Sequence, residues 1–378
     1  MKYYNVEGNK KSIKKVFAIY YICMAVFCVL RVLASVITLP ISDALYNTLF
    51  SLIIQIGILC LLPFGLYMLL LKVKPREALQ HCNAFRINWV VILISVVLGI
   101  LCFFINIAVS SLFNGMLAFT GYEFPSGGGE SDYSVGNFFL QIFLVAVIPA
   151  IAEEFLHRGL LLQGIKHIGF KKAIIISSLM FALLHFNIQQ VFYAFVLGLI
   201  MGFVSVVAKN IWPAVIIHFV NNAISVYIDF ASAKGWVFGN VLDLLESFLM
   251  KNNIFVIFVV ISLVMVVIVS LLCLFIWLLY RQALVRRVHK AIDKAYEQMG
   301  SAFASPIKVS DSHEVIVDLI ESSTLIDLEA KVLDNPINAV MPKEKSRYKA
   351  SYMDMVFLWG GVVLGALVTI FTYVWGLL

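Results

Sequence analysis

The fold class is decided by residues 89–113, which read WVVILISVVLGILCFFINIAVSSLF and carry no charged side chain. A helix of about 20 apolar residues is long enough to cross the roughly 30 Å hydrocarbon core of a bilayer. Similar stretches recur along the chain, and they do not alternate polar and apolar residues as the strands of a membrane β-barrel do. The sequence therefore predicts an all-α polytopic membrane protein.

The composition agrees with this prediction. Of the 378 residues, 62% are hydrophobic and only 13% are charged, and the mean hydropathy is +0.96. Soluble proteins carry about 25% charged residues, so a soluble enzyme, a disordered chain and a secreted disulfide scaffold are excluded. The net charge of +6 comes from basic residues between the apolar stretches. These residues form no basic face, so we expect no nucleic-acid partner.

We predict a bundle of about nine transmembrane helices in the lipid bilayer. The expected spans are residues 16–39, 48–71, 89–113, 138–165, 172–187, 191–207, 211–228, 254–280 and 354–378. Lysine and arginine concentrate in the N-terminal tail and in every second loop, which by the positive-inside rule places the N-terminus in the cytoplasm and the C-terminus outside. This bias is typical of a multi-pass protein of a bacterial plasma membrane.

The fourth span contains charged residues where a membrane helix rarely tolerates them. Residues 147–159 read VIPAIAEEFLHRG. Glu154 and Arg158 are four residues apart and can pair on one helix face. Glu153 points about 100° away from Glu154, so it is free to face a cavity. Two neighbouring carboxylates suit a proton-accepting role, although a buried ion network without chemistry would show the same pattern.

Two further spans carry polar groups at a similar depth. His185 follows an apolar stretch in the fifth span, and His218 and Asn222 share one face of the seventh, whereas Asn221 points off that face and is expected to be structural. At 1.5 Å per residue, Glu153, His185 and His218 lie about 14 to 20 Å beyond the nearest loop lysine. Three helices with polar groups near mid-membrane predict one water-filled cavity.

These side chains suit the hydrolysis of a peptide bond. The reaction needs an activated water, a stabiliser of the oxyanion and a proton donor for the leaving amine. A recognisable serine or cysteine nucleophile does not accompany the histidines, which favours direct attack by water. His185, His218 and Glu153 could also hold Zn²⁺ as three protein ligands. The sequence leaves a metal-bound water and a glutamate-activated water equally open.

The three motifs resemble those of the CPBP family of intramembrane proteases, which process CAAX proteins and bacteriocins. The motif residues are Glu153, Glu154, Arg158, Phe181, His185, His218 and Asn222, with Trp212-Pro213 before the third motif. The resemblance covers about residues 90–228. It implies an intramembrane endopeptidase related to the CAAX prenyl-protein endopeptidase, with membrane proteins or peptides as substrates.

The resemblance also implies a role for each motif residue. Glu153 and His185 would activate the water, and His218 and Asn222 would stabilise the oxyanion or help to hold a metal. Glu154 and Arg158 would order the site. His157 stands where the family often has an aromatic residue and is expected either to support the Glu153 face or to pack. In a bacterium the implied roles are peptide maturation, bacteriocin self-immunity or regulated processing.

We expect five regions in the chain. They are the N-terminal helices and a cytoplasmic loop (1–88), the protease core (89–230), an outer loop with the eighth span (231–280), a polar cytoplasmic insert (281–351) and the last span (352–378). The insert could bind a cytoplasmic partner, so a catalytically silent scaffold remains an alternative. A proton-coupled transporter is another, although the inverted repeats typical of transporters are not found.

Overall fold

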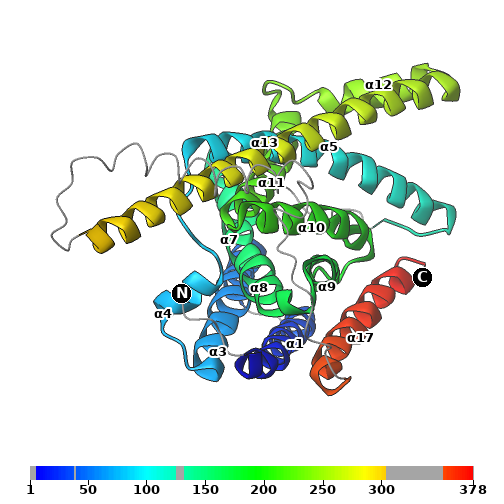
Figure 1. The fold of residues 1–378 in the computed structure, drawn as a ribbon. Helices are drawn as coiled ribbons and strands as arrows, with labels where there is room; N and C mark the ends of the chain where they lie inside the picture. Colours follow the sequence, from blue (N-terminus) through cyan, green and yellow to red (C-terminus); the bar gives the residue numbers. More distant parts are fainter. Residues whose placement is uncertain (1–5, 38–39, 125–131, 304–351, 378) are drawn as a thin grey trace.

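The computed structural model describes residues 6–37, 40–124, 132–303 and 352–377, and the regular structure within these ranges is helical (Figure 1). The first half contains α1 (Val6–Val36), α2 (Asp43–Leu52), η1 (Ile53–Leu61), α3 (Leu62–Leu71), α4 (Pro75–His81), α5 (Trp89–Phe119), α6 (Val135–Gln141), η2 (Ile142–Val147), α7 (Ile148–Glu154), η3 (Phe155–Leu161), α8 (Leu162–Ile165) and η4 (Lys166–Ile168). The second half contains α9 (Phe170–Leu184), α10 (Ile188–Ala208), α11 (Trp212–Lys234), α12 (Val241–Lys251), α13 (Ile254–Phe303) and α17 (Tyr352–Trp375).

The prediction of an all-α polytopic membrane protein is confirmed. In the described part of the chain, eight helical stretches are long and apolar enough to cross a membrane: Ile13–Val36, Ala44–Leu71, Trp89–Phe119, Val135–Ile168, Ile188–Ala208, Trp212–Lys234, Phe255–Ala283 and Met355–Trp375. The span expected at 172–187 corresponds to α9, which has only 15 residues. Such a helix is about 22 Å long and shorter than the hydrocarbon core. The chain leaves the helix at Phe186, whose φ is 49°.

Contacts between the ends of the helices show which loops share a side of the bundle. The amide of Glu123, after α5, donates to Gly376 after α17, and the amide of Ile188 donates to the hydroxyl of Thr372. On the opposite side, Lys15 of α1 donates to the carbonyl of Leu70 at the end of α3. Loops expected on the same side of the membrane therefore meet in the structure.

Two of the long helices contain π-helical segments that are linked to prolines. Pro63 stands just after η1, and Pro149 stands just after η2. Proline has no backbone N–H and its ring crowds the carbonyl four residues earlier, so the regular α-helical ladder is interrupted there. A π-helical turn widens the helix at such a point, and these turns are frequent at functional sites. The third π-helix, η3, begins directly after Glu154.

Helix α9 lies between two groups of packed apolar side chains. Its residues Met180, Leu183 and Leu184 pack with α1, η3 and α17, while Phe181 and Ala182 pack with α5, α10, α11 and α13. Figure 1 shows α17, in red, running beside α1 and α9. Because lipid tails are as apolar as these side chains, helix association in a membrane depends on close packing. The central helix α9 therefore sets the positions of the elements on both sides.

The region after the eighth span differs from the expected division in one respect. Helix α13 does not end near residue 280 but continues to Phe303. The rest of the expected insert, residues 304–351, lies outside the described residues, so the prediction of a partner-binding region there stays a prediction. The outer loop expected at 229–253 contains the helix α12, which the sequence did not predict.

Close packing of α5 against α11 gives a first test. A Cβ atom at Gly99 would lie 2.7 Å from the Cβ of Val220. We expect Gly99→Ala to destabilise the fold by about 1–3 kcal/mol, because such an overlap forces the two helices apart. Gly115 lies on the same helix, and a Cβ atom there would meet no neighbour within 4 Å among the described residues. We expect Gly115→Ala to be neutral or stabilising by up to about 1 kcal/mol.

The measurement is the thermal unfolding of both variants in the same detergent. A lower unfolding temperature for both, or for neither, would contradict this account of the packing.

Candidate active site

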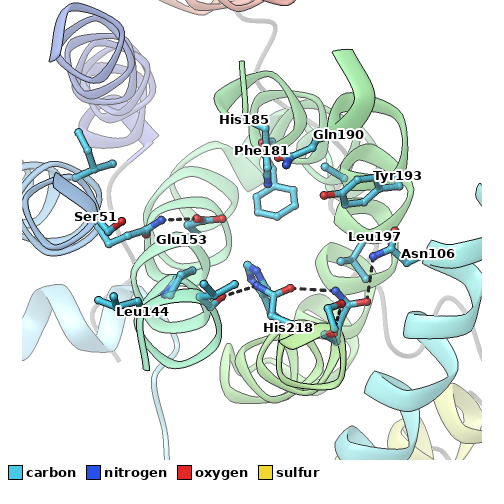
Figure 2. A pocket seen from close by; sticks show the side chains of 18 of the residues that line it. Ser51, Asn106, Leu144, Glu153, Phe181, His185, Gln190, Tyr193, Leu197 and His218 are labelled. Carbon is cyan, nitrogen blue, oxygen red and sulfur yellow. Dashed lines mark hydrogen bonds between the residues drawn. The ribbon is translucent and has the colours of Figure 1, made fainter. Parts of the chain in front are cut away.

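A cavity of about 480 Å³ opens in the bundle where α1, η1, α5, α7, α9, α10 and α11 approach one another. Figure 2 shows Glu153, Phe181, His218 and Tyr193 around this opening. The structure brings together four of the six residues that the sequence singled out, because Glu153, His185, His218 and Asn222 all line the cavity. Glu154 and Arg158 are fully buried and do not line it.

The two oxygens of the Glu153 carboxylate have different surroundings. Its side chain is almost fully buried, at 8% exposed. The amide of Gln55 donates to its Oε1 at 3.1 Å, while its Oε2 is buried and has no hydrogen-bond partner among the described residues. A buried oxygen without a partner is costly unless a water or a substrate group binds to it. Glu153 lines the cavity, and Oε2 is the oxygen of its carboxylate that still lacks a partner.

Hydrogen bonds fix the orientation of both cavity histidines. His185 Nδ1 lies 2.9 Å from the carbonyl oxygen of Phe181, and His218 Nδ1 lies 3.0 Å from Oε1 of Glu154. Both partners are acceptors, so Nδ1 carries the proton in each ring. In a neutral imidazole the other nitrogen then has a free lone pair. Each Nε2 is consequently an acceptor in the neutral ring and becomes a donor when the ring is protonated.

Glu154 and Arg158 form a buried ion pair behind His218. Arg158 donates to Oε1 of Glu154 at 2.8 Å and to the carbonyl oxygen of Gly198 at 3.1 Å. Its guanidinium group also lies 4.6 Å from the centre of the Phe181 ring. The pairing of residues four apart is the geometry that the helix spacing predicted. Because the same oxygen accepts from His218, the ion pair holds that ring in one orientation.

Asn222 is held by hydrogen bonds at both ends of its amide. Its Oδ1 accepts from Asn221 at 3.0 Å, and its Nδ2 donates to the carbonyl oxygen of Val145 at 3.0 Å. Asn221 in turn accepts from Asn106 of α5 at 3.4 Å. Asn221 also lines the cavity, and the structural role expected of it corresponds here to the hydrogen bond that it donates to Asn222. The side-chain amide of Asn222 has two N–H groups, so one is left to donate after the bond to Val145.

Pro149 lies four residues after Val145, whose carbonyl accepts from Asn222. A residue in an α-helix donates its N–H to the carbonyl four residues earlier, and proline has no N–H to donate. The interruption that widens η2 therefore also supplies the acceptor for Asn222. Trp212 and Pro213 begin the helix that carries His218 and Asn222, where a missing N–H costs nothing.

His157 supports the site from behind and does not enter the cavity. Its side chain is fully buried, and its Nδ1 lies 2.7 Å from the backbone oxygen of Glu153. Its Nε2 lies 2.9 Å from the hydroxyl of Tyr20 on α1. The ring also meets the edge of Phe181, which packs against His185 and His218 as well. His157 thus connects the first helix to the backbone that carries Glu153.

Several polar residues of the site were not predicted from the sequence. Gln55, Asn106, Gln190 and Tyr193 line the cavity, and Tyr20 holds His157. Gln55 and Asn106 stand inside expected spans, so a signal was available. Ionisable groups are the stronger signal in a membrane helix, but an uncharged amide there also needs a partner.

A metal site at His185, His218 and Glu153 remains only a prediction. Among the described residues, no group of three or more histidine, cysteine, aspartate or glutamate side chains lies close enough together to hold an ion. The described arrangement therefore does not fit a three-ligand zinc centre.

Residues 135–224 match the family model described as type II CAAX prenyl endopeptidase Rce1-like. The resemblance to the CPBP family is confirmed for this segment. Residues 135–224, called the CPBP segment below, contain all six site residues inferred from the sequence. The match supports a hydrolase with endopeptidase activity like that of the CAAX proteases. Neither the curated proteins nor the solved structures contain a significant match. Gln55, Asn106 and Tyr20 lie before the CPBP segment.

The hydrogen bond from Gln55 to Glu153 gives a second test. We expect Gln55→Leu to lower the turnover of peptide cleavage by roughly tenfold to a hundredfold, because the loss of a hydrogen bond to a charged group costs about 1.5–3 kcal/mol. The matched control is Gln141→Leu, since Gln141 bonds only to Asn137 in the described structure and lies outside this cavity. Equal rates for the two variants would contradict an orienting role for Gln55.

Proposed function

We propose that the chain is an intramembrane endopeptidase in which Glu153 activates the water that attacks the peptide bond. The observation that carries this proposal is the carboxylate of Glu153, whose Oε2 has no hydrogen-bond partner among the described residues. Glu153 lines one cavity with two imidazoles whose Nδ1 atoms are already engaged. A cavity with an unpartnered carboxylate oxygen and convergent polar groups is the arrangement expected of a hydrolytic site.

In the proposed reaction, the water donates one hydrogen to Glu153 Oε2 and the other to His185 Nε2. As its oxygen attacks the carbonyl carbon, Glu153 takes the first proton. The C–N bond then breaks, and Glu153 returns that proton to the leaving amine. One water is consumed, and a carboxyl group and an amine are released, so a single carboxylate serves as base and then as acid.

The negative charge that develops on the carbonyl oxygen needs hydrogen-bond donors. The remaining N–H of Asn222 is one such donor, held by its bonds to Asn221 and Val145. His218 can supply a second from Nε2 when its ring is protonated, with Glu154 accepting from Nδ1. Donors that are held in place before the reaction stabilise an oxyanion strongly in surroundings of low dielectric constant. No step is assigned to a metal ion.

The decisive test compares new protein N-termini in membranes that express the wild type or Glu153→Gln at equal levels. We expect a set of termini that is present with the wild type and lost in the variant, because an amide cannot accept the proton from water. Glu123→Gln is the matched control, since Glu123 is exposed and lies outside the cavity. Cleavage that persists in a metal chelator would favour the glutamate-activated water.

Termini that are identical in wild type and Glu153→Gln would refute the proteolytic function. The chain would then be better described as a scaffold, and deletion of 281–351 would be the next experiment. If cleavage is found, the termini also identify substrates. In a bacterium we propose membrane-associated peptides or membrane-protein segments, as in peptide maturation or self-immunity.

We further propose a multi-pass protein of a bacterial plasma membrane, with the N-terminus in the cytoplasm. The basic residues of the tail and of alternate loops support this orientation. The bond between Glu123 and Gly376 supports a common side for the loop after α5 and the C-terminal end. We expect alkaline phosphatase fused after residue 378 to be active and the same reporter fused at residue 75 to be inactive. The opposite pattern would reverse the orientation.

A further inference from the structure

Arg31 brings a positive charge to the wall of the cavity. It lies on α1, before the CPBP segment, and lines the same cavity as Glu153 and His185. Among the residues that line this cavity, Arg31 is the only lysine or arginine and Glu153 is the only carboxylate. In the sequence Arg31 is an isolated charge within a span, with no partner that helical spacing would assign to it.

Aromatic contacts place Arg31 on the His185 side of the cavity. Its guanidinium group lies 5.8 Å from the centre of the Phe27 ring. The Phe27 ring lies 5.4 Å from the ring of Phe186, which directly follows His185. In the described part of the chain, no carboxylate lies within ion-pair distance of Arg31, and the described ion pairs are those of Glu154 with Arg158 and His218.

The position of Arg31 explains how its charge is tolerated. It stands five residues before Val36, the end of α1, which is about 7–8 Å along the helix axis. A long side chain at this depth can extend toward the interface, so its head group remains hydrated. That extension does not explain why the head group stacks on Phe27 at the cavity wall. The wall of the cavity therefore carries a cation that can bind an anion.

We propose that Arg31 binds a carboxylate of the peptide substrate and so sets which peptide bond reaches Glu153. This inference rests on the proposed endopeptidase function. A guanidinium group matches a carboxylate with two parallel hydrogen bonds, which fixes direction as well as position. The carboxylate is either the C-terminus of the substrate or an acidic side chain near the cleaved bond.

The cavity lining favours a peptide over a lipid phosphate. Gln55, Asn106, Gln190, Asn221 and Asn222 all contribute amides to the wall. An extended peptide inside a membrane must find partners for its backbone N–H and C=O groups, and amide side chains supply both donors and acceptors. An acyl chain in the same place could not use the donors and acceptors that these amides still have after their bonds within the protein, such as the second N–H of Asn222. A lipid anchored at Arg31 would therefore fit this wall poorly.

The test measures binding in full-length Glu153→Gln, so that it does not depend on cleavage. The protein is placed in phosphatidylcholine nanodiscs with three fluorescent apolar heptapeptides: one ending in a free carboxylate, one ending in an amide, and one ending in an amide with an internal glutamate. We expect one of the two acidic peptides to bind about tenfold to a hundredfold more tightly than the neutral one, as for a charged hydrogen bond.

Adding Arg31→Gln should reduce this ratio to near one, and Arg31→Lys should retain part of it. The matched control is Arg281→Gln. Like Arg31, Arg281 is exposed and its guanidinium group lies near an aromatic ring, 5.1 Å from the centre of Trp277, but it does not line the cavity. The Arg281→Gln variant should leave the ratio of the two affinities unchanged. The peptide with the larger ratio identifies the source of the carboxylate.

The proposal is overturned if no peptide binds, if acidic and neutral peptides bind equally, or if Arg31→Gln keeps the preference. It is also overturned if phosphatidylglycerol in the nanodisc binds in a manner that depends on Arg31 while the peptides do not, since Arg31 would then hold a lipid. Failure of the proteolytic function is recognised separately, because it leaves the N-termini unchanged in wild type and Glu153→Gln.

Discussion

A charged or polar group inside a membrane must find its partners within the protein, because the hydrocarbon core offers none. Glu154 and Arg158 satisfy this constraint by pairing on one helix face, and both are fully buried. Such a pair gives little net stability, since desolvation of the two charges offsets their attraction. Its effect is on orientation: Glu154 also accepts from His218, so the pair determines which ring nitrogen faces the cavity.

The same constraint explains the irregular helices of the site. A proline removes one donor from the helix and leaves a carbonyl without its usual partner. Pro149 cannot donate to the carbonyl of Val145, and Asn222 donates to this carbonyl from another helix. The interruption therefore joins α11 to the fourth span and orients the amide that we assign to the oxyanion.

Helical spacing and charge were sufficient to predict much of this structure. Apolar length predicted the membrane fold, and the four-residue spacing of Glu154 and Arg158 predicted their ion pair. The depth argument expected Glu153, His185 and His218 in one cavity, which they share. Sequence could not predict which distant helices complete the site, because the bond from Gln55 depends on how the second span packs against the fourth. The sequence predicted a short fifth span at 172–187, but it did not predict that the chain turns at Phe186, which adopts a left-handed conformation just after α9.

The residues that complete the cavity come largely from outside the CPBP segment. Gln55 orients the carboxylate of Glu153, Tyr20 holds His157, and Arg31 supplies the only lysine or arginine side chain among the lining residues. The segment 135–224 thus carries the groups to which we assign the reaction, whereas the N-terminal helices contact them and form part of the cavity wall. If chemistry and selectivity are divided in this way, exchanging the first two spans for those of a relative, with Tyr20 and Gln55 retained, should alter which peptides are cleaved and leave the Glu153 reaction in place.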